Sequence, residues 1–592
     1  MRTISGVIAG FALVMTAYGQ VFIHQKLGEG FTDIGTGILT EGGLPFWSAV
    51  ASGNNLDIFR ITGNTNFTAS ILGSNRLAYP VDYHPTAGLL WEGRGSALGS
   101  GNTDVFVETT NISASVLGTG RTAFGFGFTN AGLPIWYGRG SANSNNIDIF
   151  RGNTNLTASL LGSGSREAIP AALVNDQLLW DGAGPNTGVN RDVFRTDLNN
   201  LSTSNVSQAP LGNNRFAVAT ALNANGDSVW HGSGSITGDY NDVFFNSTNI
   251  SLSTIGGGNP ANPRDAVAFG LSGNRLIWQG RSASTNQFYD TFTTAGSSTI
   301  NLSQSVLGSG RDSQPIDVEG SAVLWGGIGG NVGNLDVFVT LVGTTTTTRN
   351  LSQQRFGGGN TRGVREGDGI AVFPNGNAFW VGKHSSTNNK VHLFHYNWNN
   401  NTSTNLVQEA VNRDASAVYL AHNSAEQVLW AIPVGSSNYE VYLSTPNVPT
   451  TLQGTVTING FVGNTNQITL TIRQFDPYTG NVAATRSGNM NSGFTYSIAV
   501  TPGLYSQLRI TAPRCLARNI PGLRRLLGTT TLDFSLTLGD VNGDNTINDL
   551  DLLEVLFNFG ASTTAPVDLN GDGIVNDLDL LIVLFNFGAQ GD

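Results

Sequence analysis

Residues 20 to 447 alternate short apolar runs with turns rich in glycine, asparagine, serine and threonine. The runs follow the two-residue side-chain alternation of strands, so the pattern predicts short antiparallel strands joined by tight turns. Tryptophan marks a repeat of 44 to 55 residues, and its positions are Trp47, Trp91, Trp136, Trp180, Trp230, Trp278, Trp325, Trp380 and Trp430. A repeat of this length is typical of four-stranded units that stack on their neighbours.

Most units have the same internal order. In the second unit, Trp91 precedes an Asp-x-Phe triplet at Asp104, an Asn-apolar-Ser triplet at Asn111 and a glycine-rich turn that ends at Arg121. The Asp-x-Phe triplet occurs in seven units, at Asp57, Asp104, Asp148, Asp192, Asp242, Asp290 and Asp336. A residue that recurs in every unit has the same structural role in each, so we interpret the repeated Asp and Arg as turn caps or links between strands.

We expect a mainly β fold in which the units form one large β-propeller of eight or nine four-stranded blades. A single small sheet cannot bury its faces, and radial stacking lets each tryptophan fill the space between neighbours. The last unit lacks its final strand after Tyr442, whereas Val21 to Lys26 form a strand with no preceding tryptophan, so the two ends are expected to complete one unit. The triplets resemble the propeller repeats of TolB-like proteins, which implies a fold and no activity.

Residues that interrupt the repeat are the better candidates for a site within residues 20–447. They are His84, His231, His392, His395 and Trp398. The odd spacing of His392 and His395 places them on opposite faces of a strand, so we predict no metal site there. We find no Gly-x-Ser-x-Gly elbow, no His-Glu-x-x-His helix and no convincing nonrepeated carboxylate pair, and the sequence therefore predicts no catalytic residue.

A new pattern begins after the prolines at Pro446 and Pro449, which we interpret as a short linker. Apolar residues alternate in the strand period at 452–458, 468–472, 494–500, 508–512 and 532–536, separated by Gly, Asn and Pro turns. These segments predict a small β-sandwich over residues 450–537. It resembles the carboxypeptidase-regulatory or immunoglobulin-like modules of secreted bacterial proteins, which implies the role of a spacer.

Two C-terminal segments, which begin at Gly539 and Val567, repeat after 28 residues. In each copy, oxygen-bearing side chains occupy loop positions 1, 3, 5, 9 and 12, and position 7 offers its backbone carbonyl. Calcium takes about six to eight oxygen ligands, which a loop that doubles back presents at this spacing. We predict two Ca²⁺ ions, held by Asp540, Asn542, Asp544, Thr546, Asn548 and Asp551 and by Asp568, Asn570, Asp572, Ile574, Asn576 and Asp579.

Position 12 is Asp rather than the Glu of a calcium hand, and an apolar helix is expected after each loop, at Leu550 to Phe557 and Leu578 to Phe585. With this pattern, residues 538–592 resemble the dockerin module. The resemblance implies an all-α domain that calcium folds, and a cohesin module as its partner on a scaffold or cell surface. Loop positions 10 and 11, where dockerins carry small hydroxyl residues, are Asp-Leu in both copies, which argues against a conventional cellulosome partner.

The N-terminal residues 1–19 contain Arg2, an apolar stretch from Val7 to Thr16 and small residues before Gln20, a pattern that predicts a signal peptide. We therefore expect a secreted or extracellular protein, with attachment to the cell surface as an option and no membrane span. The single cysteine, Cys515, excludes an internal disulfide. A net charge of -11 argues against nucleic acid as a partner.

The predicted domains are a signal peptide at 1–19, propeller repeats at 20–447, a β-sandwich at 450–537 and a dockerin-like calcium-binding domain at 538–592. They favour a non-catalytic binding or scaffold protein that is anchored through its dockerin and takes a carbohydrate or protein ligand at the propeller. The alternative is an extracellular polysaccharide-active glycoside hydrolase delivered by its dockerin. A third hypothesis is a calcium-stabilised cap with no partner.

Overall fold

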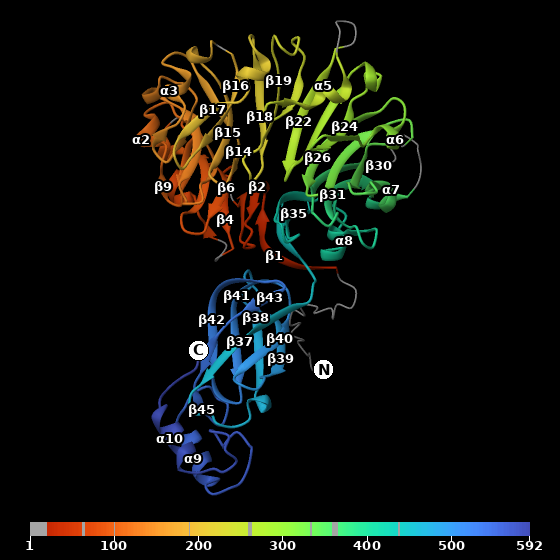
Figure 1. Ribbon diagram of the computed structural model, residues 1–592. Helices are drawn as coiled ribbons and strands as arrows, with labels where there is room; N and C mark the ends of the chain where they lie inside the picture. The colour runs from red at the N-terminus through yellow and green to blue at the C-terminus, as the bar shows by residue number, and fades with distance from the viewer. Residues whose placement is uncertain are drawn as a thin grey trace, which may run out of the picture.

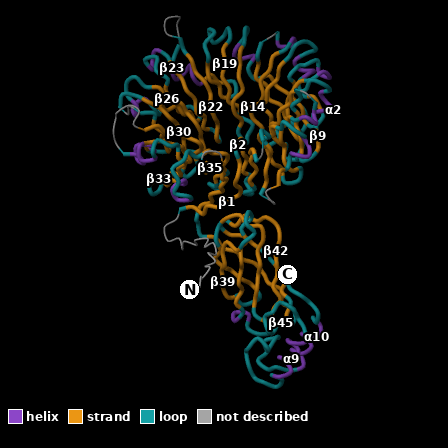
Figure 2. Tube along the Cα trace, turned by 180° about the vertical axis from the view of Figure 1, so that it is seen from behind, coloured by secondary structure: helices purple, strands orange, loops and turns teal. Residues whose placement is uncertain are grey.

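The computed structural model of the protein describes residues 21–592 apart from residues 52, 62–64, 100, 189, 258–262, 332–333, 358–364 and 436–437. The predicted signal peptide, residues 1–19, lies outside the described residues. Figures 1 and 2 show three parts in a row: a large unit of sheets, a smaller middle unit of strands, and a module with two helices at the C-terminus. We call them the nine-sheet unit, the middle unit (residues 450–537) and the C-terminal module (residues 538–592).

The described part of the nine-sheet unit contains nine four-stranded antiparallel sheets, which we number in chain order. The first three are β2 (Asp33–Leu39) to β5, with β3 (Pro45–Val50), β4 (Asp57–Arg60) and β5 (Thr65–Asn66); β6 (Leu77–His84), β7 (Gly88–Arg94), β8 (Asp104–Val107) and β9 (Thr110–Asn111); and β10 (Thr122–Phe128), β11 (Pro134–Arg139), β12 (Asp148–Arg151) and β13 (Thr154–Asn155). The next three are β14 (Glu167–Val174), β15 (Gln177–Ala183), β16 (Asp192–Asp197) and β17 (Ser202–Asn205); β18 (Phe216–Leu222), β19 (Ser228–Ser233), β20 (Asp242–Phe245) and β21 (Thr248–Asn249); and β22 (Asp265–Ser272), β23 (Arg275–Arg281), β24 (Asp290–Ala295) and β25 (Ser298–Asn301).

The last three sheets are β26 (Asp312–Glu319), β27 (Ala322–Ile328), β28 (Asp336–Leu341) and β29 (Thr347–Asn350); β30 (Arg365–Val372), β31 (Ala378–His384), β32 (His392–Asn397) and β33 (Thr402–Asn405); and β34 (Val418–His422), β35 (Val428–Val434) and β36 (Asn438–Pro446) with β1 (Phe22–Phe31). Short helices follow the fourth strand of most sheets: α1 (Ala69–Leu72), α2 (Ala114–Leu117), α3 (Ala158–Leu161), α4 (Gln208–Leu211), α5 (Ile250–Ile255), α6 (Gln304–Leu307), α7 (Leu351–Phe356) and α8 (Leu406–Ala410). Single 3₁₀ turns are η1 (Ser96–Leu98), η2 (Ser141–Asn143), η3 (Pro185–Thr187), η4 (Ala283–Thr285), η5 (Ser385–Thr387) and, in the middle unit, η6 (Thr465–Gln467).

The repeated tryptophan is the core residue of each sheet. Trp180 lies on the second strand of the fourth sheet, is fully buried, and stacks on Phe194 of the neighbouring strand at a ring-centroid distance of 4.3 Å. It also packs in one cluster with Ile135 and Ile149 of the preceding sheet. A Cβ at Gly182 would lie 2.9 Å from the Trp180 ring, which explains the glycine two residues after the tryptophan.

The repeated Asp and Arg link one sheet to the next. Arg121, which directly precedes the first strand of the third sheet, reaches Asp104 on the second sheet through Nε to Oδ1 (2.6 Å) and Nη2 to Oδ2 (2.9 Å). The same carboxylate accepts hydrogen bonds from Ser113 Oγ (2.8 Å) and Asn111 Nδ2 (3.0 Å). The pairs with this arrangement are Asp57–Arg76, Asp104–Arg121, Asp148–Arg166, Asp192–Arg215, Asp242–Arg264 and Asp290–Arg311. We call each pair an inter-sheet staple.

The staples also explain the recurring Asn-x-Ser/Thr triplets. Asn111 Oδ1 accepts hydrogen bonds from the backbone N–H groups of Ser113 (3.2 Å) and Ala114 (3.0 Å) at the start of α2, while its Nδ2 group binds the staple carboxylate. The triplet is therefore a helix-start and staple motif. The interpretation of the repeated residues as structural agrees with these contacts.

The N-terminal strand completes the ninth sheet. β1 pairs antiparallel with β36, from Phe22 opposite Pro446 to Phe31 opposite Tyr439, which is the exchange predicted from the two ends of the repeat. The same strand holds the middle unit, because Gln25 Nε2 donates to Leu504 O (2.8 Å) and Leu504 N donates to Gln25 Oε1 (2.7 Å). One strand thus fixes both the last sheet and the neighbouring unit.

The expected fold class is wrong. We expected a single propeller of eight or nine blades, but the structure shows a mainly β chain with a series of separate four-stranded sheets, and no closed barrel is formed by the described strands. Each hydrogen-bond ladder ends at its fourth strand. Between successive sheets, the described residues form isolated parallel bridges such as Leu56 with Leu77, side-chain packing and the staples. A sequence repeat specifies the strands of each sheet and leaves the assembly of the sheets unspecified.

The middle unit has two sheets around one core. One contains β40 (Thr495–Val500), β37 (Thr450–Ile458) and β43 (Thr529–Thr531), with β44 (Phe534–Leu536) also paired to β37, and the other contains β39 (Val482–Asn489), β38 (Thr469–Phe475), β41 (Gly503–Ala512), β42 (Arg514–Leu526) and β45 (Leu538–Asp540). Cys515 is buried in this core, and burial raises the pKa of its thiol to about 12, so the thiol is inert at neutral pH.

The C-terminal module contains two short helices, α9 (Asp549–Phe557) and α10 (Asp577–Phe585), of nine residues each. The all-α expectation is therefore wrong as well: most of the module is loop, and its first strand, β45, extends a sheet of the middle unit by pairing with β42. Oxygen-rich loops need extended and turn backbone to direct their groups inward, which leaves few residues for helix. Across the described residues, none of the helices has the length and apolar character required to cross a membrane.

Candidate functional site

Both C-terminal loops end in a helix start that fixes loop positions 9 and 12. In the first loop, Asn548 Oδ1 accepts from Leu550 N (2.8 Å) and Asp551 Oδ2 accepts from Asn548 N (2.9 Å), which is a capping box. Asn576 and Asp579 repeat it in the second loop, at 2.8 Å and 2.9 Å. Local helix capping therefore places the last two predicted side-chain ligands of each loop.

The carboxylates at positions 1 and 12 lie inside each loop. Asp540 accepts from the N–H groups of Gly543 (2.8 Å) and Asn545 (3.0 Å), and Asp551 Oδ1 accepts from Val541 N (2.7 Å). Asp568 has the corresponding contacts with Gly571 (3.0 Å) and Gly573 (3.1 Å). All four acids at these positions are at most 4% exposed, namely Asp540, Asp551, Asp568 and Asp579.

Positions 3, 5 and 7 follow the same geometry in the two copies. Asn542 Oδ1 accepts from Asp544 N (2.8 Å), and Asp544 Oδ1 accepts from Thr546 N (2.9 Å). The second loop repeats both bonds at 2.8 Å and 2.9 Å, through Asn570, Asp572 and Ile574. The structure therefore brings the twelve predicted ligand residues into two matching loops; that each one coordinates an ion stays a prediction.

The charge around these loops requires a cation. Residues 538–592 contain nine Asp and one Glu but no Lys or Arg. Burial raises the pKa of Asp540, and the charges of Asp551 and Asp544 raise it further. Among the described residues, no three His, Cys, Asp or Glu side chains are grouped to hold a metal ion, so a cation here must also use Asn amide and backbone carbonyl oxygens. An all-oxygen donor set of this kind suits calcium.

A match to a known family identifies the type of this module. Residues 538–584 match the dockerin type I domain. The dockerin prediction is confirmed for these residues, and calcium as the cofactor is supported because dockerin type I domains bind calcium. The number of ions bound stays a prediction. No curated protein matches the chain.

Solved structures give weaker likenesses. The chain is similar to a type II cohesin–X–dockerin complex from Acetivibrio cellulolyticus, with 26% identity over 24% of this chain and 97% of that chain and a TM-score of 0.20. It is also similar to a prolyl endopeptidase, with 10% identity over 70% of this chain and 49% of that chain and a TM-score of 0.35. A third likeness is to oligopeptidase B from Trypanosoma brucei, with 9% identity over 63% of this chain and 54% of that chain and a TM-score of 0.33. The chain thus spans about half the length of these peptidases, and the likeness to TolB-like propellers is not confirmed.

The dockerin helices carry a large exposed apolar surface that the sequence analysis did not identify. Phe557 and Phe585, at the ends of α9 and α10, are 83% and 82% exposed. The other exposed apolar side chains of the two helices and of the residues just after them are Leu550, Leu553, Leu556, Phe559, Leu578, Leu581, Leu584 and Phe587. The sequence contains the signal for this surface. A nine-residue helix can bury only one face, and these helices have apolar residues on more than one face, so some of them must stay exposed. We call this surface the paired helix face.

Three of the residues that interrupt the repeat, His392, His395 and Trp398, have structural partners. His392 replaces the staple aspartate of the eighth sheet and bonds to Asn405 Nδ2 through Nδ1 (2.8 Å), while His395 Nε2 lies 2.7 Å from Glu426 Oε2. Both histidines are buried, at 5% and 3% exposure, and they have different partners. Trp398 lies under the Arg349 guanidinium at 4.1 Å. These contacts stabilise the nine-sheet unit.

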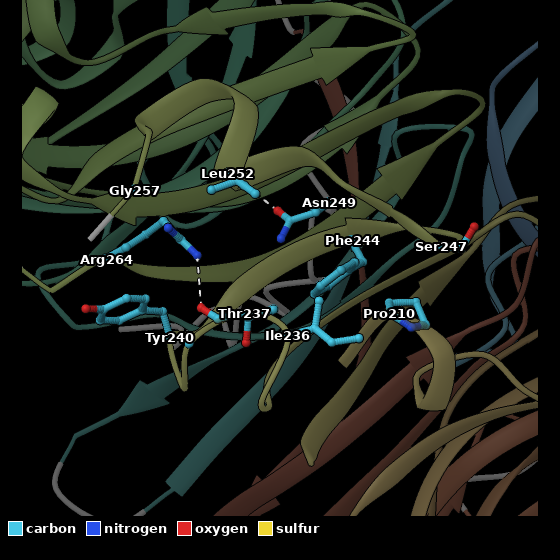
Figure 3. Close-up of a pocket in the computed structure, with 11 residues that line it drawn as sticks. Pro210, Ile236, Thr237, Tyr240, Phe244, Ser247, Asn249, Leu252, Gly257 and Arg264 are labelled. Carbon is cyan, nitrogen blue, oxygen red and sulfur yellow. Dashed lines mark hydrogen bonds between the residues drawn. The ribbon is translucent and has the colours of Figure 1, made fainter. Parts of the chain in front are cut away.

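A pocket of about 420 Å³ lies at the fifth sheet (Figure 3). Ile236, Tyr240 and Leu252 line it, and Arg264 is the one charged residue among its described lining residues. Arg264 is the staple partner of Asp242 and also donates to Thr237 O at 3.3 Å. Because its guanidinium is engaged, the pocket offers an apolar and hydroxyl surface without an acid–base pair.

The fifth sheet is expected to lose stability in acid through His231. The buried Nδ1 of His231 has no hydrogen-bond partner among the described residues, and burial lowers its pKa to about 4. In the unfolded chain a histidine takes up a proton near pH 6.5, so the unfolded state gains protons first as the pH falls. The free energy of unfolding therefore keeps its full value above about pH 6.5. It falls by at most about 3 kcal/mol, because of His231, between about pH 6.5 and 4.

The measurement is urea unfolding of the wild type and His231→Gln at about pH 7 and about pH 4. His231→Gln should lose less stability on acidification than the wild type, whereas the control His84→Gln, at a position bonded to Thr86, should behave as the wild type does. Equal losses in all three proteins would refute this assignment.

Proposed function

We propose that the protein is an extracellular, non-catalytic assembly component that is attached to a cohesin-type partner through its calcium-loaded dockerin. The observation that carries the proposal is the paired helix face, which begins in the segment that matches the dockerin type I domain (residues 538–584) and in which Phe557 and Phe585 are more than four-fifths exposed. The nine-sheet unit is the binding or scaffold part, and the middle unit is the spacer that presents the dockerin. The predicted localisation is consistent with dockerin modules of extracellular assemblies.

An exposed surface of this kind requires a partner. Aromatic side chains that protrude from a surface are common anchors of protein interfaces, because each one removes a large apolar area from water on binding. The inner sides of the helices already pack within the module, where Val555 and Val583 are fully buried with Ile547 and Leu569. The outer side is open in the described structure, so the hypothesis of a self-contained cap leaves it unexplained.

The side chains of the paired helix face indicate what surface a partner must have. Leu550 and Leu578, at loop position 11, are 57% and 56% exposed, and the residues before them, Asp549 and Asp577, are exposed acids at the helix starts. A complementary surface has an apolar centre and Lys or Arg at its rim. This differs from the hydroxyl contacts that the resemblance to dockerins implied at positions 10 and 11.

The buried acids of the nine-sheet unit favour a structural role over catalysis. Burial raises the pKa of Asp82, Glu92 and Asp181, which is a property of general acids. Each of them, however, accepts a backbone N–H of the following sheet: Asp82 from Phe128 (3.1 Å), Glu92 from Gly125 (3.2 Å) and Asp181 from Ala219 (3.1 Å). Their lone pairs hold neighbouring sheets together, and the glycoside hydrolase alternative gains no support from them.

The test is capture of the full chain on immobilised type I and type II cohesin domains, in millimolar calcium and in chelator. Calcium-dependent binding supports the proposal, and the double variant Phe557→Ala/Phe585→Ala should bind at least about tenfold more weakly, because buried aromatic anchors contribute about 2 kcal/mol or more each. Each single variant should lose only about twofold, since the two near-identical helices let the partner use either one. Val482→Ala, at a 48% exposed apolar position of the middle unit, is the control.

Two results would count against the proposal: binding that persists in chelator, or binding that the double variant retains in full. A failure to bind either cohesin class, with calcium present and the dockerin folded, would also contradict a cohesin-type partner.

A further inference from the structure

The middle unit covers one calcium loop and leaves the matching part of the other open. Asn570, at position 3 of the second loop, is 3% exposed, whereas Asn542, its counterpart in the first loop, is exposed. We infer that the middle unit holds the second loop in its calcium-binding conformation, so that the second site fills at lower calcium concentration than the first and releases its ion last. The inference rests on the proposed calcium binding and concerns the residues outside the dockerin that support it.

Backbone groups of the middle unit grip the second loop. The loop between β37 and η6 directs Val462 N and Gly463 N at Asn570 O, at 2.8 Å and 3.1 Å. The approach is close, because a Cβ on Gly463 would lie 2.4 Å from Gly571 O. Phe461 is buried beside these residues, at 7% exposure. The carbonyl of a predicted ligand residue is therefore fixed from outside the loop whether or not an ion is bound.

A cation of the middle unit lies behind the same loop. Arg514, at the start of β42, donates from Nη1 to Asp568 O and from Nη2 to Thr564 O (2.7 Å). The charges that act on its guanidinium include those of Asp568 and Asp579, the acids at positions 1 and 12. Arg514 has a φ of 70°, in the left-handed region that side chains other than Gly adopt rarely, so the surrounding contacts hold it there.

The first loop has a different support. Its first residue, Asp540, ends β45 and pairs with Arg514 of β42, and Asn545 Oδ1 accepts from Ala517 N (2.7 Å). Among the described residues, no hydrogen bond from the middle unit reaches the Asn542 carbonyl, and no Arg side chain donates to a carbonyl of this loop as Arg514 donates to Asp568 O. The repulsion among Asp540, Asp544 and Asp551 is thus left to calcium alone, whereas Arg514 offsets part of it in the second loop.

Preorganisation has a defined consequence for affinity. A loop that is already held in its bound conformation loses less conformational freedom when the ion binds, and a nearby cation offsets the repulsion among the acids that would otherwise favour unfolding of the ion-free loop. The same cation also repels calcium. A guanidinium that contacts a backbone carbonyl, away from the ligand side chains, therefore weakens calcium binding least. The geometry of Arg514 meets this condition.

The experiment is hydrogen–deuterium exchange of the full chain at graded calcium concentrations, read separately for peptides that cover residues 540–551 and 568–579. In the wild type, the second loop should gain protection at about tenfold lower calcium than the first. Arg514→Gln should raise the calcium midpoint of the second loop by about tenfold and leave that of the first unchanged. Arg514→Lys, which keeps the charge, should restore part of the difference.

Gly463→Ala tests the backbone grip without a change of charge. It should also raise the midpoint of the second loop, because the added methyl group cannot fit against Gly571. The matched controls are Arg518→Gln, which loses an exposed ion pair with Asp592 outside both loops, and Gly343→Ala in the nine-sheet unit, where a Cβ would lie at an ordinary contact distance of 3.7 Å from Thr345 O. Both controls should keep the wild-type midpoints.

The outcomes separate this inference from the proposed function. Equal midpoints for the two loops in the wild type, or equal shifts of both loops in Arg514→Gln, would overturn the inference while calcium binding stands. Protection that does not depend on calcium in either loop would overturn the proposed calcium sites themselves.

Discussion

Chelation of calcium in the intact protein is expected to lower the thermal midpoint of the C-terminal module by more than about 10 °C and to leave the nine-sheet unit unchanged. At a free calcium concentration about a hundred times the Kd, each bound ion contributes about 2.7 kcal/mol. For a domain of this size, 1 kcal/mol shifts the midpoint by about 4–8 °C. Without the ion, the charge of Asp551 acts unfavourably on the buried Asp540, and the module contains no Lys or Arg.

The measurement is differential scanning calorimetry in millimolar calcium and in chelator. The double variant Asp551→Ala/Asp579→Ala removes the buried carboxylate at position 12 of both loops and should melt in calcium as the wild type melts in chelator. Asp549→Ala, at an exposed acid outside the predicted ligand set, is the matched control and should keep the full calcium effect. A thermal midpoint of the module that does not change between calcium and chelator would refute the metal assignment.

Asp104→Ala is expected to destabilise the nine-sheet unit by about 3–5 kcal/mol. Asp104 is fully buried, and its removal leaves the Arg121 guanidinium, whose side chain is 12% exposed, without its counter-charge. Because the pair joins the second and third sheets, the loss should increase hydrogen exchange at the strands on both sides of the junction. Chemical unfolding followed by tryptophan fluorescence measures the change, since the buried tryptophans report on the sheets.

Two further variants show whether the loss of stability in Asp104→Ala comes from the unpaired buried charge. In Asp104→Leu/Arg121→Leu both charges are absent, and the double variant should be more stable than Asp104→Ala because no charge is buried alone. Glu366→Ala breaks an exposed pair with Lys383, whose N–O distance is 2.9 Å, and should change stability by less than about 1 kcal/mol. Similar losses for Asp104→Ala and Glu366→Ala would contradict the staple.

The strands of each sheet could be predicted from the sequence because their determinants are local and repeated. Trp91 and Asp104 recur with their neighbours in unit after unit, and the unpaired strand at Val21 to Lys26 indicated where the ends would meet. The assembly of the sheets could not be predicted, and the single propeller that we expected was wrong. Packing between sheets depends on contacts such as Trp180 with Ile135, which no repeat length specifies.

The two oxygen-rich loops of the dockerin segment could be recognised from the sequence because the spacing of oxygen ligands for calcium is fixed within a few residues. What supports and surrounds them could not. Arg514 and Gly463 lie far from the second loop in sequence, and the strands β39 and β42 of the middle unit were not among those expected, because polar and charged residues interrupt their alternation. A contact between two segments that each occur once leaves no periodic signal.

The most direct test of the calcium-dependent docking module is a calorimetric titration of the full chain with calcium, beside the Asp551→Ala/Asp579→Ala variant. We predict two ions bound per wild-type chain, in two steps of different affinity, and no high-affinity binding to the variant. Absence of calcium binding to the wild type, or binding that the variant retains, would contradict the assignment on which the proposed function depends.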